Sequence, residues 1–356
     1  MDTNHIIPEM IVGGKKIGPN QPVFIIAEIG GNYETVEQAK KMIDYASEAG
    51  ADAVKLQTYL ADKLAQPGSR FEVKGLGEVS QYEIVKKFEV DVESHREIFR
   101  YAKEKGLVMF STPSCKETAD ILEKLGTDCY KTGADEITNI PLLKYIARKG
   151  KPILMSTGIC TMAEISIAID AVKEEGNNEI LLFQTTSIYP NDPKDANLRV
   201  IKTFQQAFGL PVGFSDHTAD IFTPVAATAL GAMMIEKHFC LSRQDQGTDT
   251  FFALEPNEFK EMCKGIRIAQ AALGTSQKYI LEGEKKTAKG FRKSFIAWRD
   301  IKKGEALSEE NTIIKRPGQG IWPQHYETVY RAKVNKDIKK DEFIRWEDIT
   351  ERNLSS

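Results

Sequence analysis

Several features that commonly reveal a protein's class are missing from this 356-residue chain. Its five cysteines are odd in number and never form a C-x-x-C pair, so we expect neither a disulfide framework nor a structural zinc site. No apolar run approaches the roughly 20 residues that cross a bilayer. The first residues, MDTNHIIPEMIVGGKKIG, lack the basic-then-apolar order of a signal peptide. We therefore expect a cytoplasmic protein without membrane contacts.

The charge pattern argues against a nucleic-acid-binding protein. Charged residues make up 28% of the chain, both signs are mixed throughout, and the formal net charge is −3. There is no basic stripe and no interleaving of aromatic and basic residues, so we expect no nucleic-acid partner. At this length the chain can hold one large α/β domain plus a small one, or two medium domains.

Short apolar runs alternate with longer amphipathic stretches over the first 274 residues. Continuous apolar runs are typical of strands buried on both faces of a parallel sheet. The strand candidates are residues 22–28, 53–57, 107–113, 129–134, 152–158, 179–187, 211–216 and 233–239. The helix candidates are residues 36–50, 94–106, 117–126, 139–150, 162–176, 223–231 and 255–274. Strand–helix units repeated about eight times predict an α/β fold, the (β/α)8 TIM barrel.

A doubly wound open sheet is the alternative fold. Such a sheet would carry a G-x-G-x-x-G phosphate turn after its first strand. The sequence there is AEIGGNYE, which lacks this spacing, so the barrel is favoured.

The pattern changes after Gly274, and we expect the barrel to occupy residues 1–274. Residues 275–291 are polar and rich in lysine and glycine, as in a linker. Residues 292–356 repeat an aliphatic-x-x-DIKK pattern, which starts at Ala297 and again at Val334. We expect a small, mostly β module there, which caps the barrel, dimerises or supplies a substrate contact.

Polar residues end nearly every predicted strand. The carboxyl ends of barrel strands are where TIM-barrel enzymes place their reactive groups. Buried lysines, glutamates and histidines are costly unless they are paired or used, so these residues predict an active site. They are Glu28, Lys55, Gln57, Ser111, Thr112, Lys131, Glu136, Ser156, Thr157, Gln184, Ser187, Tyr189, Ser215, Asp216, His217, Glu236 and His238.

Alternation along a strand indicates which of these side chains face the barrel mouth. Ser215 and His217 share one face of their strand, and Glu236 and His238 share one face of the next. Asp216 and Lys237 should face the helices. Two neutral imidazoles on neighbouring strands predict a site for one divalent metal with positions open to water and substrate. The alternative is a pair of core histidines that bind no metal.

The two strand-end lysines predict an anion site. Lys55 and Lys131 can clamp a phosphate-carboxylate substrate, with hydrogen bonds from Ser156 and its neighbours. Alternatively, each lysine lies at the barrel end with its ammonium group in solvent. Glu28 is a candidate acid/base residue, and the alternative is a structural salt bridge from Glu28 to one of these lysines.

At this point the motifs AEIGGN, GADAVKLQTY, YKTGADE, STGI, QTTSIYP, GFSDHT and IEKHF can be compared with known families. The chain resembles the sialic acid synthases, which include the neuraminate, legionaminate and pseudaminate synthases and a spore-coat relative. GFSDH followed about twenty residues later by EKHF is the most specific part. The C-terminal module resembles the antifreeze-like SAF domain, a β-clip fold, and the resemblance implies a domain-swapped homodimer.

The resemblance also implies a role for individual residues. His217 and His238 match the ligands of Mn²⁺ or Mg²⁺. Glu28 and Glu136 match the carboxylates that handle protons and sugar hydroxyls. Apart from the resemblance, the chemistry of the reaction makes Glu28 the first candidate for proton transfer and Glu236 a candidate to orient the water. The resemblance places Lys55, Lys131, Ser156 and Ser215 around phosphoenolpyruvate, Glu136, Tyr189 and Asp249 around the sugar, and Arg316 of the neighbouring subunit at the N-acyl group. The strand-end residues Gln57 and Ser187 are expected to bind substrate as well.

The implied reaction is the condensation of phosphoenolpyruvate with an N-acetylated amino-sugar to a nine-carbon sugar acid. Tyr33 stands where the family commonly has histidine, and residues 68–85 show no match to an asparagine that contacts the sugar in the neuraminate branch, so the sugar stays open. The alternatives are a 3-deoxy-sugar-acid synthase of the KDO or DAHP kind and a catalytically silent sugar-binding or coat-assembly protein.

Overall fold

The computed structural model describes residues 7–73, 77–89 and 91–351, in two compact units that divide after Gly274. Each unit has its own apolar core. None of the described helices has the length and apolarity needed to cross a membrane.

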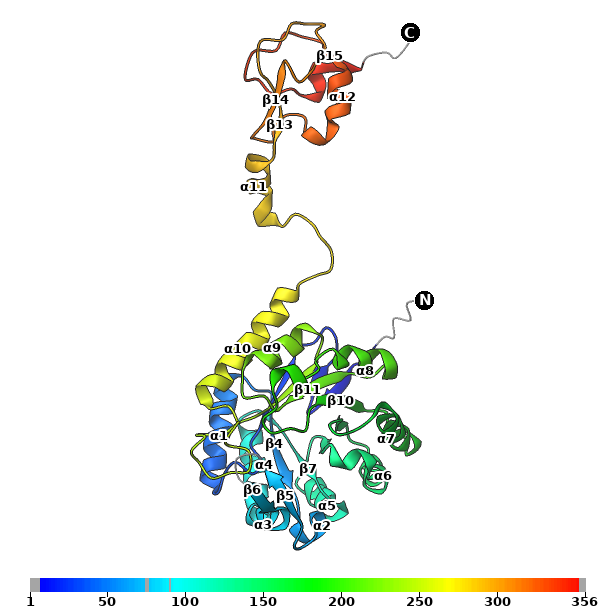
Figure 1. The fold of residues 1–356 in the computed structure, drawn as a ribbon, viewed down its shortest axis with the longest axis vertical. Helices are drawn as coiled ribbons and strands as arrows, with labels where there is room; N and C mark the ends of the chain where they lie inside the picture. Colours follow the sequence, from blue (N-terminus) through cyan, green and yellow to red (C-terminus); the bar gives the residue numbers. More distant parts are fainter. Residues whose placement is uncertain (1–6, 74–76, 90, 352–356) are drawn as a thin grey trace. The chain divides into compact units, whose positions relative to one another are not determined.

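The first unit is a closed barrel of eight parallel strands surrounded by helices (Figure 1). Around the barrel the strand order is β10-β11-β12-β3-β4-β7-β8-β9, with β9 paired to β10 to close it. This confirms the predicted (β/α)8 fold. The strands are β3 (Phe24–Glu28), β4 (Ala53–Thr58), β7 (Val108–Pro113), β8 (Tyr130–Thr132), β9 (Ile153–Ser156), β10 (Ile180–Thr185), β11 (Val212–Asp216) and β12 (Met234–His238).

Helices follow the strands and cover the outside of the barrel (Figure 1). Many of them begin with a side-chain cap, as α1 does at Thr35, or end in a left-handed glycine such as Gly50. Helix α8 was missing from the sequence prediction. The helices are α1 (Val36–Ala49), α4 (Val92–Glu104), α5 (Lys116–Lys124), α6 (Ile140–Ala147), α7 (Met162–Glu174), α8 (Val200–Phe208), α9 (Phe222–Ala229) and α10 (Pro256–Leu273).

Two β-hairpins and two short helices add to the barrel. The hairpin of β1 (Met10–Val12) and β2 (Lys15–Ile17) packs its apolar side chains against the residues that fill the barrel interior. A longer excursion between β4 and α4 contains α2 (Ala61–Leu64), β5 (Arg70–Val73), β6 (Gly77–Ser80) and α3 (Gln81–Lys87).

The residues inside the barrel alternate with those under the helices along every strand. Phe24 and Ile26 of β3, for example, belong to the inner core, whereas Ile25 and Ala27 pack with the helices. Continuing this alternation places Glu28 on the inner face at the carboxyl end. The inner apolar residues therefore form a floor beneath the polar residues that end the strands.

The second unit contains helix α11 (Glu282–Phe291), which lies within the segment predicted as a linker. Two antiparallel strand pairs follow, and side chains from these strands and from the segments between them form the core around Phe295 and Ile344. The elements are β13 (Ser294–Ala297), β14 (Thr312–Lys315), α12 (Tyr326–Arg331), β15 (Ala332–Val334) and β16 (Ile349–Glu351).

The two DIKK segments form two similar turns, which are joined to each other by hydrogen bonds. Ile301 and Ile338 exchange backbone hydrogen bonds of 2.8 and 2.9 Å. Asp300 accepts a hydrogen bond from the backbone N–H of Lys340, and Asp337 accepts the equivalent bond from that of Lys303. The sequence repeat is thus a local two-fold pairing.

The inner floor of the barrel tolerates no extra atom at Gly213. A Cβ built there would lie 2.7 Å from Phe183 Cε1 and 2.9 Å from the backbone oxygen of Met234. We expect Gly213→Ala to lower the free energy of unfolding of the barrel by about 1–3 kcal/mol. Denaturant unfolding followed by circular dichroism measures it. Gly283→Ala is the matched control, because no atom lies within 4 Å of its added Cβ, and equal stability of both variants would contradict the prediction.

Candidate active site

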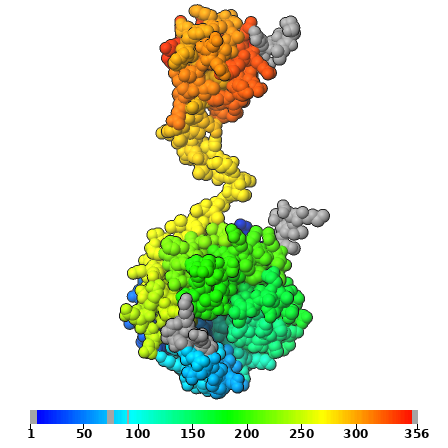
Figure 2. All heavy atoms as spheres, in the orientation of Figure 1, coloured from blue at the N-terminus to red at the C-terminus, as the bar shows by residue number. Residues whose placement is uncertain are grey.

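A cavity of about 440 Å³ opens where the barrel strands end. Figure 2 shows the first unit hollowed beside the blue-to-cyan segment that carries α2 and α3. Of the residues predicted to have a catalytic, substrate-binding or metal-binding role, all except Glu28 and Arg316 line this cavity. The structure thus brings together Lys55, Gln57, Lys131, Glu136, Ser156, Ser187, Tyr189, Ser215, His217, Glu236, His238 and Asp249.

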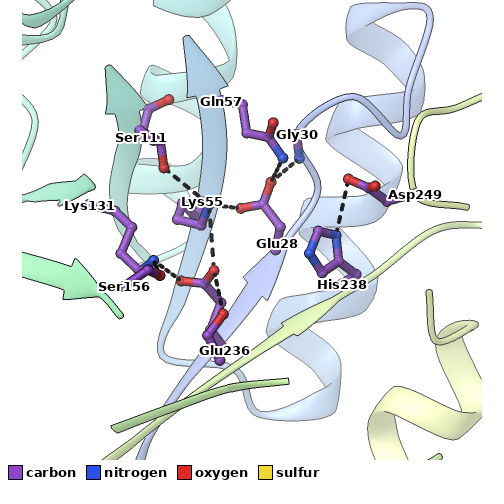
Figure 3. Close-up of polar contacts among 12 residues, drawn as sticks. Glu28, Gly30, Lys55, Gln57, Ser111, Lys131, Ser156, Glu236, His238 and Asp249 are labelled. Atoms are coloured by element: carbon purple, nitrogen blue, oxygen red, sulfur yellow. Dashed lines mark hydrogen bonds and ion pairs between the residues drawn. The ribbon is translucent and has the colours of Figure 1, made fainter. Parts of the chain in front are cut away.

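A buried network of opposite charges forms one wall (Figure 3). Lys55 Nζ lies 2.5 Å from Glu28 Oε2 and 3.6 Å from Glu236 Oε1. Lys131 Nζ lies 3.8 Å from Glu236 Oε2 and donates to Ser156 Oγ. Ser215 Oγ donates to Glu236 Oε1 at 3.2 Å. Glu236 therefore lies between two ammonium groups.

Burial and pairing set the ionisation of these four groups. Burial lowers the pKa of Lys131 to about 8. The pKa of Lys55 is raised, because the carboxylates of Glu236 and Glu28 more than offset its burial. Burial also acts on Glu236, but Lys131 and Lys55 hold its pKa below the usual value. Burial raises the pKa of Glu28 to about 7.

Glu28 is fully buried beside the cavity and does not line it. Its Oε1 accepts hydrogen bonds from Gly30 N at 2.9 Å and Gln57 Nε2 at 3.1 Å. A Cβ at Gly30 would lie 2.5 Å from this oxygen, so the close approach requires glycine. The salt bridge considered as an alternative role for Glu28 is therefore present, with Lys55 as the partner.

The two predicted metal ligands lie side by side, with ring centroids 5.3 Å apart. Burial lowers the pKa of His217 to about 4 and that of His238 well below its ordinary value, so both rings are neutral. His217 Nδ1 lies 2.7 Å from the carbonyl oxygen of Thr186 and donates to it, which leaves a lone pair on Nε2. His238 Nδ1 is buried and has no hydrogen-bond partner among the residues that the structure describes. Asp249 Oδ2 is 3.4 Å away, and a neutral ring forms no ion pair with it.

These features fit the donor set of a divalent metal. Two neutral imidazoles with free lone pairs are common metal ligands. Among the described residues, no cluster of three or more His, Cys, Asp or Glu side chains is arranged to hold a metal ion. A metal here would therefore need oxygen ligands from water or substrate, and metal binding stays a prediction.

The other walls carry hydroxyl, carboxyl and apolar groups. The ring of Tyr189 lies on His217, with 4.2 Å between centroids. Burial raises the pKa of Glu136 to about 7 and that of Asp249 to about 6. Such groups suit the hydroxyl groups of a sugar, because each can donate or accept a hydrogen bond near neutral pH.

Some strand-end residues of the sequence prediction face away from the cavity. Ser111 bonds to Thr58 Oγ1 at 2.7 Å, and Gln184 donates to the carbonyl oxygen of Ala196. Both follow inner residues by one position, so alternation turns them outward. Arg316 belongs to the second unit, where its guanidinium lies over the ring of Phe291.

Sequence reasoning missed part of the lining. Tyr59, the last residue of the motif GADAVKLQTY, and Thr248, which directly precedes Asp249, both line the cavity and were not predicted. The excursion after β4 adds Leu64, Ile84 and Val85. No motif marks these apolar residues, so only their position in the fold reveals them.

The fold and the cavity together define the class of protein. It is a (β/α)8 enzyme in which two buried lysines can bind an anion beside two neutral imidazoles. Comparison with known proteins narrows this class. The NeuB family signature matches residues 42–278, and the SAF domain matches residues 292–350. The chain therefore belongs to the NeuB family, which confirms the predicted resemblance and the enzyme assignment.

The relatives of the chain are similar over nearly its whole length. N,N'-diacetyllegionaminic acid synthase of Campylobacter jejuni is 39% identical over 90% of this chain and 98% of its own. Pseudaminic acid synthase of the same organism is 37% identical over 92% and 97%. The crystal structure of N-acetylneuraminic acid synthetase from Leptospira borgpetersenii in complex with citrate is 30% identical, with a TM-score of 0.72 over 80% of this chain and 96% of that one.

The pKa of Lys131 gives anion binding a pH dependence. We expect the affinity for a non-reactive phosphoenolpyruvate analogue to fall by up to about tenfold per pH unit above pH 8, where Lys131 loses its charge. Lys55 keeps its charge over this range because its pKa is raised. Calorimetric titrations from pH 6.5 to 9.5 measure the effect. Lys131→Met should bind weakly with no break near pH 8, and a level wild-type profile would exclude this role for Lys131.

Proposed function

We propose that this protein condenses phosphoenolpyruvate with an open-chain N-acylated amino-hexose and water, giving a nine-carbon 2-keto-3-deoxy sugar acid and phosphate. The observation that carries the proposal is the meeting of two buried lysines and two neutral histidines in one cavity of a NeuB-family barrel. N-acetylmannosamine and 2,4-diacetamido-6-deoxyhexoses are the proposed sugars, since relatives are named for legionaminic, pseudaminic and N-acetylneuraminic acids.

The lysine wall suits phosphoenolpyruvate. Lys55 and Lys131 can balance the phosphate and carboxylate charges, and the Ser156 and Ser215 hydroxyls can add hydrogen bonds. In the absence of substrate, Glu28 and Glu236 balance the two lysines. Anion binding therefore uses a site whose cations are already in place and already desolvated.

The two buried glutamates, Glu28 and Glu236, suit the proton transfers of the proposed condensation. C3 of phosphoenolpyruvate attacks the aldehyde carbon, and the aldehyde oxygen takes a proton to become a hydroxyl. Water adds to C2 and loses a proton, which leaves a hydroxyl group and the phosphate on C2. The bond from C2 to the phosphate oxygen then breaks as the hydroxyl proton passes to the leaving phosphate, which gives the 2-keto group. Glu236 Oε2 is buried and has no hydrogen-bond partner among the described residues, which supports a role in orienting this water. Glu28, with its pKa near 7, would exchange protons through the ammonium group of Lys55 rather than by direct contact with the substrate.

His217 and His238 would hold the divalent metal, Mn²⁺ or Mg²⁺. A metal at this position supplies Lewis-acid polarisation of the aldehyde oxygen, which stabilises transition-state charge by several kcal/mol. The neutral rings and the unpartnered Nδ1 of His238 support this assignment. We also propose a domain-swapped homodimer in which Arg316 of the partner subunit reaches the N-acyl group.

A substrate panel tests the reaction itself. We expect phosphate release from phosphoenolpyruvate with N-acetylmannosamine or a 2,4-diacetamido-6-deoxyhexose, and none with arabinose 5-phosphate. Mass detection should find the nine-carbon acid. Turnover of arabinose 5-phosphate alone would favour the KDO or DAHP alternative, and binding without phosphate release would favour the silent sugar-binding alternative.

A histidine variant tests the metal. We expect His238→Ala to lower kcat at least a thousandfold, on the order of the loss of a major electrostatic contribution, with the far-UV circular dichroism unchanged. His325→Ala, which changes a histidine of the second unit next to Trp346, is the matched control and should keep its activity. Wild-type turnover that persists at full rate after chelation and dialysis would exclude a metal role.

A further inference from the structure

A second buried ion pair lies on the opposite face of the strands that carry the two histidines. Lys237 Nζ of β12 lies 2.5 Å from Asp216 Oδ2 of β11, and both side chains are 0% exposed. The two residues are direct neighbours in the parallel ladder. Neither lines the cavity, as the alternation predicts. The mechanism proposed above uses neither residue.

Thr218 completes this pair. Its backbone N–H and its hydroxyl donate to the two oxygens of Asp216, each at 2.9 Å. Lys237 Nζ donates to the carbonyl oxygen of Thr218 at 2.5 Å and approaches its hydroxyl at 3.3 Å. The ammonium group therefore has a partner for each of its protons, and both carboxylate oxygens have partners too. We call Asp216, Thr218 and Lys237 the outer triad.

Stability alone is a poor reason for such a triad. Desolvation of two charges offsets their attraction, so a well-packed apolar pair at the same place is commonly as stable or more stable. Directional hydrogen bonds do fix positions, however, and a fully satisfied buried network is rigid. The outer triad therefore supplies geometry more than free energy.

The triad flanks the histidines along the chain. His217 lies between Asp216 and Thr218, both held by Lys237. His238 and Glu236 lie on either side of Lys237 itself. Alternation turns these three inner side chains toward the cavity when the triad faces outward. From this backbone position, His217 Nδ1 donates a hydrogen bond to the Thr186 carbonyl at 2.7 Å.

We propose that Asp216, Thr218 and Lys237 are positioning residues that fix the spacing of the His217 and His238 rings and the tautomer of His217. The proposal deepens the proposed function and rests on it only where the histidines are taken as metal ligands. The first measurement below needs neither metal nor substrate.

Histidine NMR tests the positioning directly. Only five histidines occur in the chain, so ¹⁵N-histidine labelling gives a simple spectrum, and His217→Gln identifies the His217 signal. In chelated wild-type protein, we expect a His217 Nδ1–H signal that exchanges slowly with solvent. We expect Lys237→Met and Thr218→Val to lose or broaden this signal.

Metal titration gives the second measurement. With Mn²⁺ as the probe, we expect both variants to bind roughly 10–100-fold more weakly than wild type, the range found when groups that orient metal ligands are removed. Lys237→Met leaves the Asp216 carboxylate buried without a cation, which destabilises the fold. If this single variant does not fold, the double variant Asp216→Asn/Lys237→Met takes its place. Thr218→Val keeps the ion pair and tests the triad by itself.

Lys149→Met is the matched control. It removes a lysine whose ammonium lies 2.6 Å from Asp120 of α5, outside the cavity lining. It should leave the His217 signal and the Mn²⁺ affinity unchanged. An unchanged His217 signal in all the triad variants, whatever their melting temperatures, overturns the proposal. If wild-type protein binds no Mn²⁺, the metal assignment in the proposed function fails, and the histidine signal still decides the positioning role.

Discussion

The cost of burying charge is the constraint on which this structure depends. Lys55, Lys131, Glu28 and Glu236 are buried at the carboxyl end of the barrel, and none would stay ionised there alone. Two positive and two negative groups within one network lower that cost. The network leaves two ammonium groups at the cavity wall, where a small anion with several charges can reach them.

The same strands carry a different arrangement on each face. The inner face of β11 and β12 presents Ser215, Glu236 and the two histidines to the cavity, and the outer face holds the Asp216–Lys237 pair. A β-strand has this capacity because successive side chains point in opposite directions. Adjacent residues of the sequence thus provide the side chains of the cavity and the ion pair on the opposite face of the strands. One substitution in these motifs therefore changes either a side chain of the cavity or the ion pair on the opposite face.

In the second unit, one short sequence pattern is used twice. Its repeated DIKK segments pair with each other, so that each copy caps the other through an aspartate and a backbone N–H. A small module has few apolar residues with which to form a core. Reciprocal hydrogen bonds between two copies of one turn help to hold such a core, centred on Phe295 and Ile344, together.

The sequence by itself determined the barrel, its strands and the residues at their carboxyl ends, because buried parallel strands leave a continuous apolar signal and alternation fixes which side chains face inward. It also indicated the family through motifs such as GFSDHT and IEKHF. Only the tertiary structure decided that Glu28 lies behind Lys55, that Glu236 lies between two lysines, and that α2 and α3 add an apolar wall. The physical reason is that alternation specifies a face, whereas the depth of a side chain and its partners across the barrel depend on strand stagger and closure.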